Sequence, residues 1–478
     1  MTLPAPFARW REQARPAFLA HGELPLLVTV DGPLPEAAGL RLLNRIRRGL
    51  RPREVEQVLE RCDAASLDAV LIAALDAWEA AEGPSADAWV FRGLTTLGRA
   101  AVVRTVGRRI ERWARAQRLA WSIHGLAVLA RAASPEAVLT LTRLSGASSD
   151  PRVRAEAGRA LDRLAEAEGI DRAELEERLT PDLGLDARGR RTLDYGPRRF
   201  EVALDAELVP WVIVEAGARR STLPRPRASD DPTLAAAARA VFAALKQDAK
   251  VLLRTRTRAL ERAMRTQRTW TRDDFLSRWV LPPALRPLSA RILWIARAAG
   301  ARRVFRVEED GGLSDAHEAA IELEESARIS VAHPLRIPSD ERAAWRVVLD
   351  DYELLPPFEQ LERAVHVWPE EALRADRFDV CAGWRVHPAA LHRLASAGWR
   401  ETGDGWTDAL SLAAGDQELC LRFYPGYRPR DLGDSSARVE LEALTIEGPA
   451  ADFEDLDEVT RSEVLRDLES IAPRGAEP

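Results

Sequence analysis

The chain has 478 residues and a formal net charge of -6, so its overall charge gives no argument for binding nucleic acid. Its length allows about two to four domains. Lys246 and Lys250 are the only lysines, so nearly all positive charge is arginine and the abundance of arginine alone indicates no function. Hydrophobic residues make up 46% and aromatic residues 6% of the chain, a balance that favours helix.

The cysteines and the first residues bear on the compartment. Cys62, Cys381 and Cys420 are far apart and form no CxxC pair, which excludes a zinc ribbon or a disulfide framework and fits a reducing compartment. The first residues lack the apolar core of a signal peptide. No stretch approaches the roughly 18 uninterrupted apolar residues of a membrane span. We therefore expect a soluble cytoplasmic protein without membrane contact.

The first part of the chain has a helical pattern. Residues 1–86 form a helical lead-in, with helices expected over 36–48 and 52–80. Residues 87–185 contain short amphipathic segments separated by small polar turns, typical of HEAT-like helical repeats. These segments cover residues 87–104, 106–119, 121–132, 135–145 and 151–168. They follow no strict period, so an ordinary helical bundle is the alternative.

The sequence pattern then changes twice along the chain. Residues 186–228 predict a small β-meander and a linker, with strands around 192–193, 200–204 and 209–214. Residues 229–300 predict a helical segment. Its helices are expected over residues 232–267, 270–279 and 290–299.

Residues 301–478 predict an α+β domain with antiparallel strands, so the fold class is a multidomain α+β protein with a HEAT-like N-terminal half. Residues 329–368 organise this part through a strand, a His333-Pro334 turn and a helix that carries Trp345. Two interpretations are open for this stretch. It is a structural corner, or it holds a site in which His333 and either Asp350 or Asp351 act as an acid/base pair.

Several separated motifs resemble one known family. They lie at residues 181–185, 193–200, 262–270, 329–368 and 462–467. With these motifs the chain resembles the bacterial domain-of-unknown-function family 4132, the molybdate-metabolism-regulator-like proteins, over about residues 120–471. Relatives often accompany AAA-type ATPases and von Willebrand A-type proteins, so the resemblance implies a protein partner of one of these kinds.

The chain departs from the family pattern at two points. The family usually has glutamine where this chain has Pro356, which weakens any polar role for that turn. Many relatives carry a Trp-Gly-Arg domain associated with nucleic acids, and this chain shows no such domain. The resemblance therefore implies no DNA-related function here.

Two rows of arginines recur at steps of three and four residues, which places each row on one helical face. The first arginine row is Arg104, Arg108, Arg112, Arg115 and Arg118. The second arginine row is Arg254, Arg258, Arg262, Arg265 and Arg268. Like charges at this spacing destabilise a helix by a few tenths of a kcal/mol each, so the rows suggest an anionic partner inside or outside the fold.

Three interpretations of the rows are open. Acidic segments of the same chain neutralise them, an acidic protein partner binds them, or nucleic acid or another polyphosphate does. The last is disfavoured because no aromatic residues alternate with these arginines to stack bases.

The sequence gives weak signals for catalysis. It contains no HExxH, GxxxxGK[ST], GxGxxG or GxSxG motif, so we expect no metal and no cofactor. The resulting hypothesis is a non-enzymatic cytoplasmic adaptor or regulatory scaffold that binds a protein partner through its helical-repeat surface. The alternatives are an enzyme with a site near His333 and an anion-binding or nucleic-acid-binding protein that uses the two rows.

Overall fold

The computed structural model describes residues 6–10, 14–20, 24–213, 218–403, 405–415, 417–448 and 452–473. The chain divides into two compact units. Unit 1 comprises Met1–Ala203 and Pro210–Leu252, and unit 2 comprises Leu204–Val209 and Leu253–Pro478. About half of the residues are helical and the strands pair antiparallel, which confirms the predicted α+β class.

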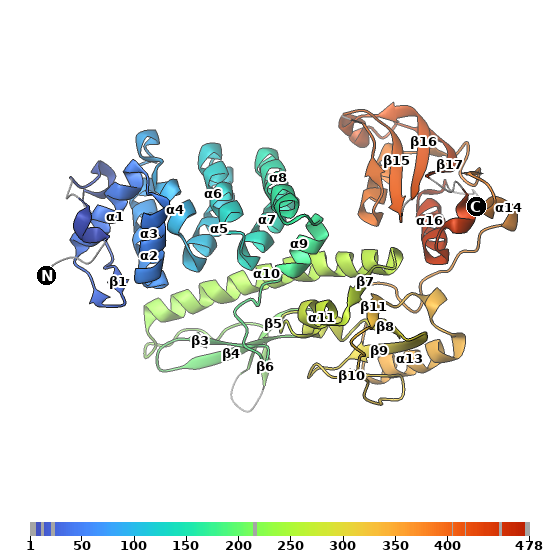
Figure 1. The fold of residues 1–478 in the computed structure, drawn as a ribbon, viewed down its shortest axis with the longest axis horizontal. Coiled ribbons are helices and arrows are strands. Elements are labelled where there is room, and N and C mark those ends of the chain that lie inside the picture. The colour runs from blue at the N-terminus through green and yellow to red at the C-terminus, as the bar shows by residue number, and fades with distance from the viewer. Residues whose placement is uncertain are drawn as a thin grey trace. The chain divides into compact units, whose positions relative to one another are not determined.

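Unit 1 contains a stack of helices that share one apolar core. In the second half of the stack each helix packs on the next and on the next but one, so α5 contacts α6 and α7, and α6 contacts α7 and α8 (Figure 1). The helices are α1 (Glu36–Arg48), α2 (Pro52–Arg61), α3 (Ala64–Ala80), α4 (Val90–Leu97), α5 (Ala100–Arg115), α6 (Leu119–Ala132), α7 (Pro135–Ala147), α8 (Pro151–Glu168) and α9 (Arg172–Arg178).

Local capping explains where several of these helices begin. The Asp150 side chain accepts a hydrogen bond from the Arg152 amide at the start of α8, and Pro151 fills the first helical position. Gly169 ends α8 in the left-handed region, at φ 66°. The predicted helices over 36–48 and 151–168 are confirmed as α1 and α8.

Two helices predicted to be continuous are broken. The helix predicted over 52–80 is wrong, because Asp63 caps a separate α3 by accepting from the Ser66 amide at 2.9 Å. The helix predicted over 87–104 is wrong as well, because the chain leaves α4 at Leu97 and restarts at Ala100. The start of α5 is capped by the buried carboxylate of Asp68, which accepts hydrogen bonds from the backbone amides of Arg99, Ala101 and Val102.

A four-stranded antiparallel sheet follows the stack in unit 1, in the order β3-β4-β5-β6. Its strands are β3 (Arg190–Asp194), β4 (Arg199–Leu204), β5 (Pro210–Ile213) and β6 (Arg219–Arg220). They confirm the three predicted strands, apart from Val214, which lies outside the described residues. Helix α10 (Pro232–Arg265) starts in unit 1 and ends in unit 2.

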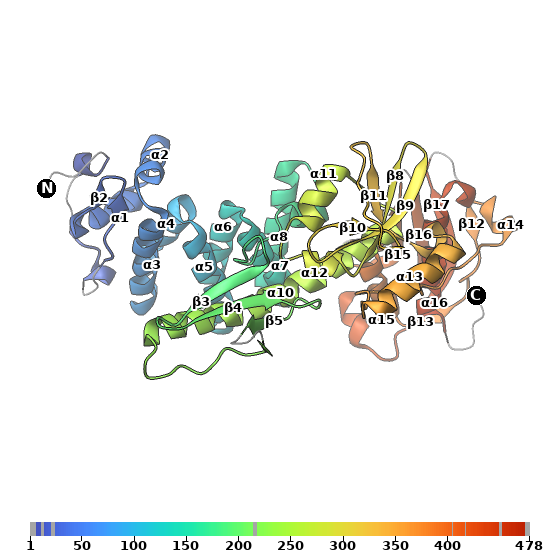
Figure 2. The same ribbon diagram turned by 90° about the horizontal axis from the view of Figure 1, so that it is seen from below.

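The first sheet of unit 2 has the order β10-β9-β8-β11-β7. Figure 2 labels its strands β8, β9, β10 and β11. Its strands are β7 (Thr269–Thr271), β8 (Leu293–Ala298), β9 (Ala301–Val307), β10 (Leu313–Ser314) and β11 (Arg328–Val331). Helix α13 (Ser339–Asp351) inserts Trp345, Val348 and Leu349 into a core with β8 residues Leu293 and Ile295. Residues 329–331 thus form the predicted strand, and the predicted helix with Trp345 is α13.

One predicted helix in this region is wrong, and another is confirmed except at its first two residues. Residues 290–299 contain strand β8, a buried apolar run whose pattern alone cannot distinguish a strand from a buried helix. Residues 270–279 begin in β7, and the chain turns into helix α11 (Arg272–Phe275) at Thr271, whose hydroxyl accepts from the Asp274 amide. The helix then continues as a π-helical segment, Leu276–Val280.

The second sheet of unit 2 has the order β12-β17-β16-β15-β14, and β13 also pairs with β17. Its strands are β12 (Arg377–Phe378), β13 (Arg385–Val386), β14 (Arg400–Glu401), β15 (Thr407–Ala414), β16 (Gln417–Tyr427) and β17 (Val439–Glu447). Helices α15 (Pro388–Leu394) and α16 (Glu458–Ile471) share a core with it. Further short strands and helices are β1 (Val28–Thr29), β2 (Gly32–Pro33), α12 (Arg286–Ser289) and α14 (Glu370–Leu373), and the chain also has short 3-10 turns such as Phe7–Arg9.

Within the described part of the chain, no helix combines the length and the apolar character that a membrane crossing requires.

Candidate functional site

The first arginine row lies mostly on α5, in unit 1. Arg104, Arg108, Arg112 and Arg115 are exposed along this helix. Arg118 does not belong to the same helix, because α5 ends at Arg115 and Gln117 adopts a φ of 57°. Arg118 instead precedes α6 as its N-cap residue, so the predicted five-residue row on one helix is shortened to four.

Three members of the first arginine row form ion pairs within the chain. Arg112 meets Glu79 at 2.5 Å, Arg115 meets Glu111 at 3.3 Å, and Arg118 meets Glu82 at 2.6 Å. Arg104 and Arg108 form no ion pair with any described residue. The part of the row that is open to an external anion is therefore its first two members.

A second positive group lies close to Arg104. Arg191, on β3, donates to the Leu183 carbonyl at 2.7 Å. Burial lowers the pKa of Arg191, and the charge of Arg104 lowers it further. Nearby in unit 1, burial raises the pKa of Asp248, although Arg143 and Arg191 counteract this rise. Arg104 thus has a cationic neighbour, whose charge Asp182 and Asp248 partly offset.

Arg109 is a charged residue of α5 that the row pattern misses. Its side chain is only 16% exposed and forms ion pairs with Asp76 and, at 2.8 Å, with Glu79. Glu79 also accepts from the Trp113 indole at 2.7 Å. One feature of the sequence could have identified Arg109. It precedes Trp113 by four residues, which places it beside this tryptophan at the edge of the apolar face of the helix.

The members of the second arginine row, in unit 2, differ in their exposure and in their contacts. Arg254, Arg258 and Arg262 are exposed and form no ion pair with a described residue. Arg265 is buried, and its guanidinium donates to Asp467 at 3.0 and 2.5 Å. Arg268 follows the end of α10 and lies 5.4 Å from the centre of the Trp270 ring. Only the exposed members resemble the predicted anion-binding surface.

Glu463, on α16, is the centre of a buried ionic cluster. Its two carboxylate oxygens accept from Nε and Nη2 of Arg363 at 2.6 Å each, and Arg265 lies 3.4 Å away. Burial by itself would raise the pKa of Glu463, but the hydrogen bonds from Arg363 and His333 lower it to about 2. Glu463 therefore remains a carboxylate that compensates two buried arginines.

Asp467 lies one helical turn after Glu463 and differs from it in pKa. Burial raises the pKa of Asp467, and the charge and hydrogen bonds of Arg265 only partly offset that rise. Its Oδ2 also accepts from the Trp399 indole at 2.9 Å. The cluster joins α10, α16 and the turn before β14 in one set of hydrogen bonds.

His333 belongs to this cluster and is fully buried. Its Nδ1 accepts from the Leu335 amide at 3.2 Å, so its Nε2 carries the hydrogen that it donates to Glu463 at 3.2 Å. Asp350 and Asp351 are exposed at the end of α13, and neither forms a hydrogen bond with His333. The structure does not bring the predicted acid/base pair together.

A cavity of about 600 Å³ borders this cluster. Arg258 and Arg262 line it from α10, and Arg466 lines it from α16. Arg466 is already paired with Glu359 at 2.6 Å, and His366 with Glu469 at 2.9 Å. The cavity thus combines paired charges with the guanidinium groups of Arg258 and Arg262, for which the described residues provide no ion pair.

The cysteines and acidic groups show no reactive arrangement in the described residues. Burial raises the pKa of Cys62 to about 11 and that of Cys381 to about 12, so both thiols stay protonated at neutral pH. In the same residues, no group of three or more His, Cys, Asp or Glu side chains is placed to hold a metal ion.

Comparison with known proteins finds two matches. Residues 217–399 match the family model described as "Domain of unknown function (DUF4132)", which agrees with the resemblance seen in the motifs of that segment. The chain is 30% identical over 465 residues to the uncharacterized protein YehI of Escherichia coli (strain K12). The alignment covers 95% of this chain and 38% of YehI, so the chain spans well under half of that relative. No solved structure matches the chain.

Proposed function

We propose that the chain is a non-enzymatic cytoplasmic adaptor or regulatory scaffold whose helical half binds an acidic surface of a protein partner. The observation that carries the proposal is the state of Arg104 and Arg108. Both are exposed on α5, one helical turn apart, and neither forms an ion pair with a described residue.

The energetics favour an external anion at these two residues. Two cations one turn apart repel each other by a few tenths of a kcal/mol, and Arg191 adds to the positive charge near Arg104. A carboxylate from a partner would relieve this repulsion, and each charge-assisted hydrogen bond contributes roughly 1.5–3 kcal/mol. A partner would gain less binding free energy at Arg112, Arg115 and Arg118. Its carboxylate would first have to displace Glu79, Glu111 or Glu82.

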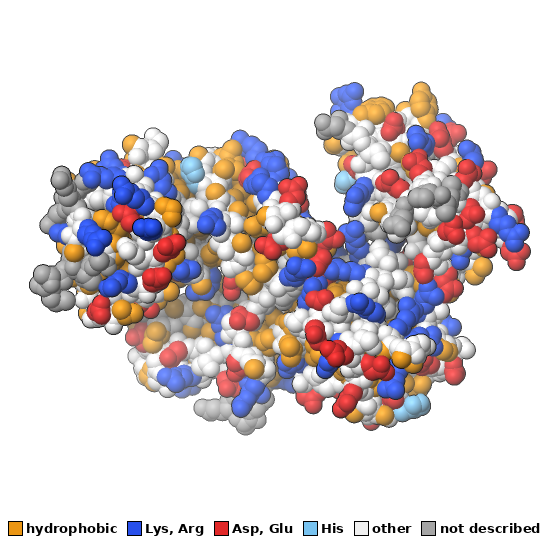
Figure 3. Space-filling model, viewed as in Figure 1, with side chains coloured by type: hydrophobic (Ala, Val, Ile, Leu, Met, Phe, Trp, Pro, Cys, Tyr) orange, Lys and Arg blue, Asp and Glu red, His pale blue; other side chains and the backbone are white. Residues whose placement is uncertain are grey.

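The arrangement of the helices supports a binding role. The helices in the second half of the stack in unit 1 contact their next and next-but-one neighbours along the chain. In this proposal they are HEAT-like repeats. Such repeats present extended surfaces, which suit recognition of a protein better than recognition of a small substrate. On the face shown in Figure 3, acidic and basic side chains are interspersed, so binding through local groups of arginines is favoured over a uniform field.

The alternatives have less support. An enzyme that uses His333 would need a free ring nitrogen, whereas both nitrogens are hydrogen-bonded inside the fold. The resemblance to the family suggests an AAA-type ATPase or a von Willebrand A-type protein as the partner. Nucleic acid stays an alternative ligand for Arg104 and Arg108, and the experiment separates it from a protein.

The test compares two charge-reversal pairs with the same spacing. Arg104→Glu with Arg108→Glu removes the proposed contact, and Arg159→Glu with Arg163→Glu is the control on α8, where both arginines are exposed and paired with Glu156. Tagged full-length proteins are expressed in the native host, and the captured proteins are quantified.

We expect one protein to be recovered in stoichiometric amounts with the wild type and the control, and to be lost with the Arg104/Arg108 variant. Equal recovery with all three proteins contradicts the proposed surface. Salt-sensitive binding to random DNA that disappears in the same variant would favour nucleic acid instead.

A further inference from the structure

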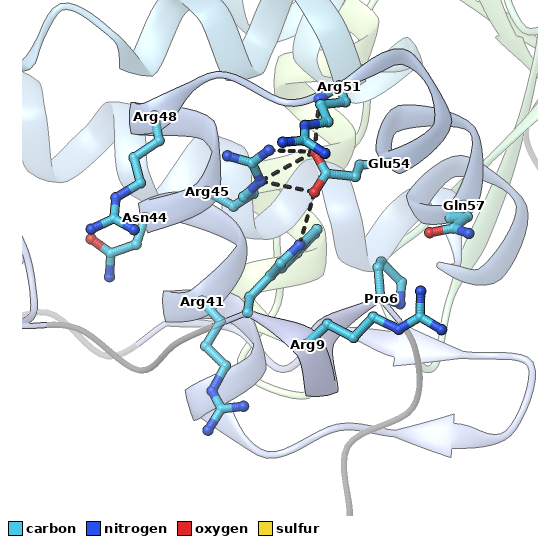
Figure 4. A pocket seen from close by; sticks show the side chains of 10 residues that line it. Pro6, Arg9, Arg41, Asn44, Arg45, Arg48, Arg51, Glu54 and Gln57 are labelled. Atoms are coloured by element: carbon cyan, nitrogen blue, oxygen red, sulfur yellow. Dashed lines mark hydrogen bonds and ion pairs between the residues drawn. The ribbon is translucent and has the colours of Figure 1, made fainter.

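A pocket near the N-terminus is lined mainly by arginine. It has a volume of about 400 Å³ and lies within unit 1, between the 3-10 turn Phe7–Arg9 and helices α1 and α2 (Figure 4). Arginine accounts for about one residue in seven of the chain but for half of the ten residues that line this pocket. These arginines are Arg9, Arg41, Arg45, Arg48 and Arg51.

The single carboxylate of the pocket is already saturated. Glu54 accepts from Nε and Nη2 of Arg45, the latter at 2.7 Å, from the Trp10 indole at 3.2 Å and from the Arg51 backbone amide at 2.7 Å. Burial alone would raise the pKa of Glu54, but these hydrogen bonds lower it. Glu54 therefore neutralises Arg45 and has no free lone pair for the other arginines.

Two of the remaining arginines have no counter-charge in the described part of the chain. Arg9 and Arg51 are exposed, and neither guanidinium forms an ion pair with a described residue. In Figure 4, Arg51 lies beside Glu54, whereas Arg9 reaches away from it, so the two guanidinium groups border different sides of the pocket. The pocket thus offers up to ten N–H donors at these two residues alone.

We propose that this pocket binds a small anion that carries phosphate groups. A phosphate group has three strong acceptor oxygens and a charge near -2, so it can receive hydrogen bonds from several guanidinium groups at once. A single carboxylate has two oxygens and one charge, which one arginine satisfies, as Glu54 and Arg45 show. The pocket volume lies within the range of small-ligand sites.

This site is independent of the proposed adaptor surface, because it uses no residue of the first arginine row. It is also distinct from the cavity in unit 2, whose lining holds four carboxylates beside five arginines. The sequence pattern did not reveal it, since Arg9 is far in sequence from α1 and α2 and joins them only in the fold.

The probe for this site is inorganic tripolyphosphate, and the measurement is isothermal titration calorimetry on the full chain. The pocket variant is Arg9→Gln with Arg51→Gln. The substitution at residue 51 keeps the amide that Glu54 accepts from, so α2 retains its cap. The matched control is Arg47→Gln with Arg53→Gln, which removes two exposed arginines from α1 and α2 that do not line the pocket.

We expect tripolyphosphate to bind the wild type and the control with the same affinity, and the pocket variant at least about tenfold more weakly. Thermal unfolding of the unliganded proteins checks that both variants fold. No binding to the wild type at low salt overturns the proposal. An equal loss in both variants does so too, because it means that tripolyphosphate responds only to the overall charge of the protein.

Discussion

Arg363 and Glu463 form a two-point ion pair with both N–O distances at 2.6 Å, although they are 100 residues apart and nearly inaccessible to solvent. Glu463 lies on α16, and Arg363 follows the Pro356-Pro357 break after α13. The pair therefore connects the segment around the first sheet of unit 2 to the last helix. Its parallel hydrogen bonds fix the orientation of both side chains.

Replacing Glu463 with glutamine should destabilise unit 2 strongly. The substitution breaks the buried two-point ion pair of Arg363, which keeps only Glu261 at 3.0 Å, and it leaves Arg265 with Asp467 alone. Breaking a buried ion pair costs about 3–5 kcal/mol. Glu458→Gln is the control on the same helix, because its partner Arg336 is partly exposed and such pairs contribute about 0–1 kcal/mol. Urea unfolding followed by tryptophan fluorescence measures both variants. Similar losses of unfolding free energy for the two substitutions would show that the buried cluster stabilises the fold no more than an exposed ion pair does.

The stability contributed by Glu463 should depend on pH in the acid range. Its pKa is about 2 in the folded chain and near the ordinary glutamate value of 4.5 when unfolded. The contribution is therefore complete above about pH 4.5 and is lost as the pH falls toward 2. The pKa of the neighbouring Asp467 is raised, so Asp467 acts in the opposite direction, but it is present in both proteins compared. The difference in unfolding free energy between wild type and Glu463→Gln should be constant from pH 7 to 5 and shrink by pH 3. A constant difference at pH 3 contradicts the assignment.

Local sequence patterns predicted the fold where the signals lie within one element. Asp150, Pro151 and Gly169 frame α8, and its predicted bounds are confirmed. The break before α5 was missed because Asp68, which caps it, lies 31 residues or more away in sequence. Strand β8 was missed because it lies between β9 and β11, so its first four residues are all buried and apolar and lack the alternation of a half-buried strand.

In the candidate site, too, local features were predicted and contacts between residues far apart in sequence were not. The spacing of the arginines correctly placed Arg104 and Arg108 on one face of a helix, since helical periodicity is local, and the structure shows that both are exposed. It could not identify Glu79 and Glu82 as partners of Arg112 and Arg118, because the packing of α3 against α5 brings them together. The partner of His333 is likewise 130 residues away in sequence.

Arg108 and Arg109 are adjacent in sequence and should respond differently to alanine. Arg109→Ala removes two ion pairs at a side chain that is 16% exposed, so we expect a loss of about 1.5–3 kcal/mol. Arg108→Ala removes an exposed side chain without an ion pair, and its effect should stay within about 0.5 kcal/mol. Both substitutions change helix propensity equally. Urea midpoints measured side by side give the comparison, and equal midpoints contradict the structural role of Arg109.

Gly125 and Gly158 provide a test of how closely the helices of unit 1 pack. A Cβ atom at Gly125, in α6, would lie 2.8 Å from Ile110 and 3.0 Å from Trp113, both buried on α5. Gly125→Ala should therefore destabilise by about 1–3 kcal/mol, because the buried neighbours must shift. A Cβ atom at Gly158, in α8, would meet nothing within 4 Å. Gly158→Ala should stabilise by about 0.4–1 kcal/mol, since alanine restricts the unfolded chain and favours helix. Thermal and urea unfolding of the two variants should give shifts of opposite sign. Two shifts of the same sign would mean that α5 and α6 do not approach each other as closely as Gly125 requires.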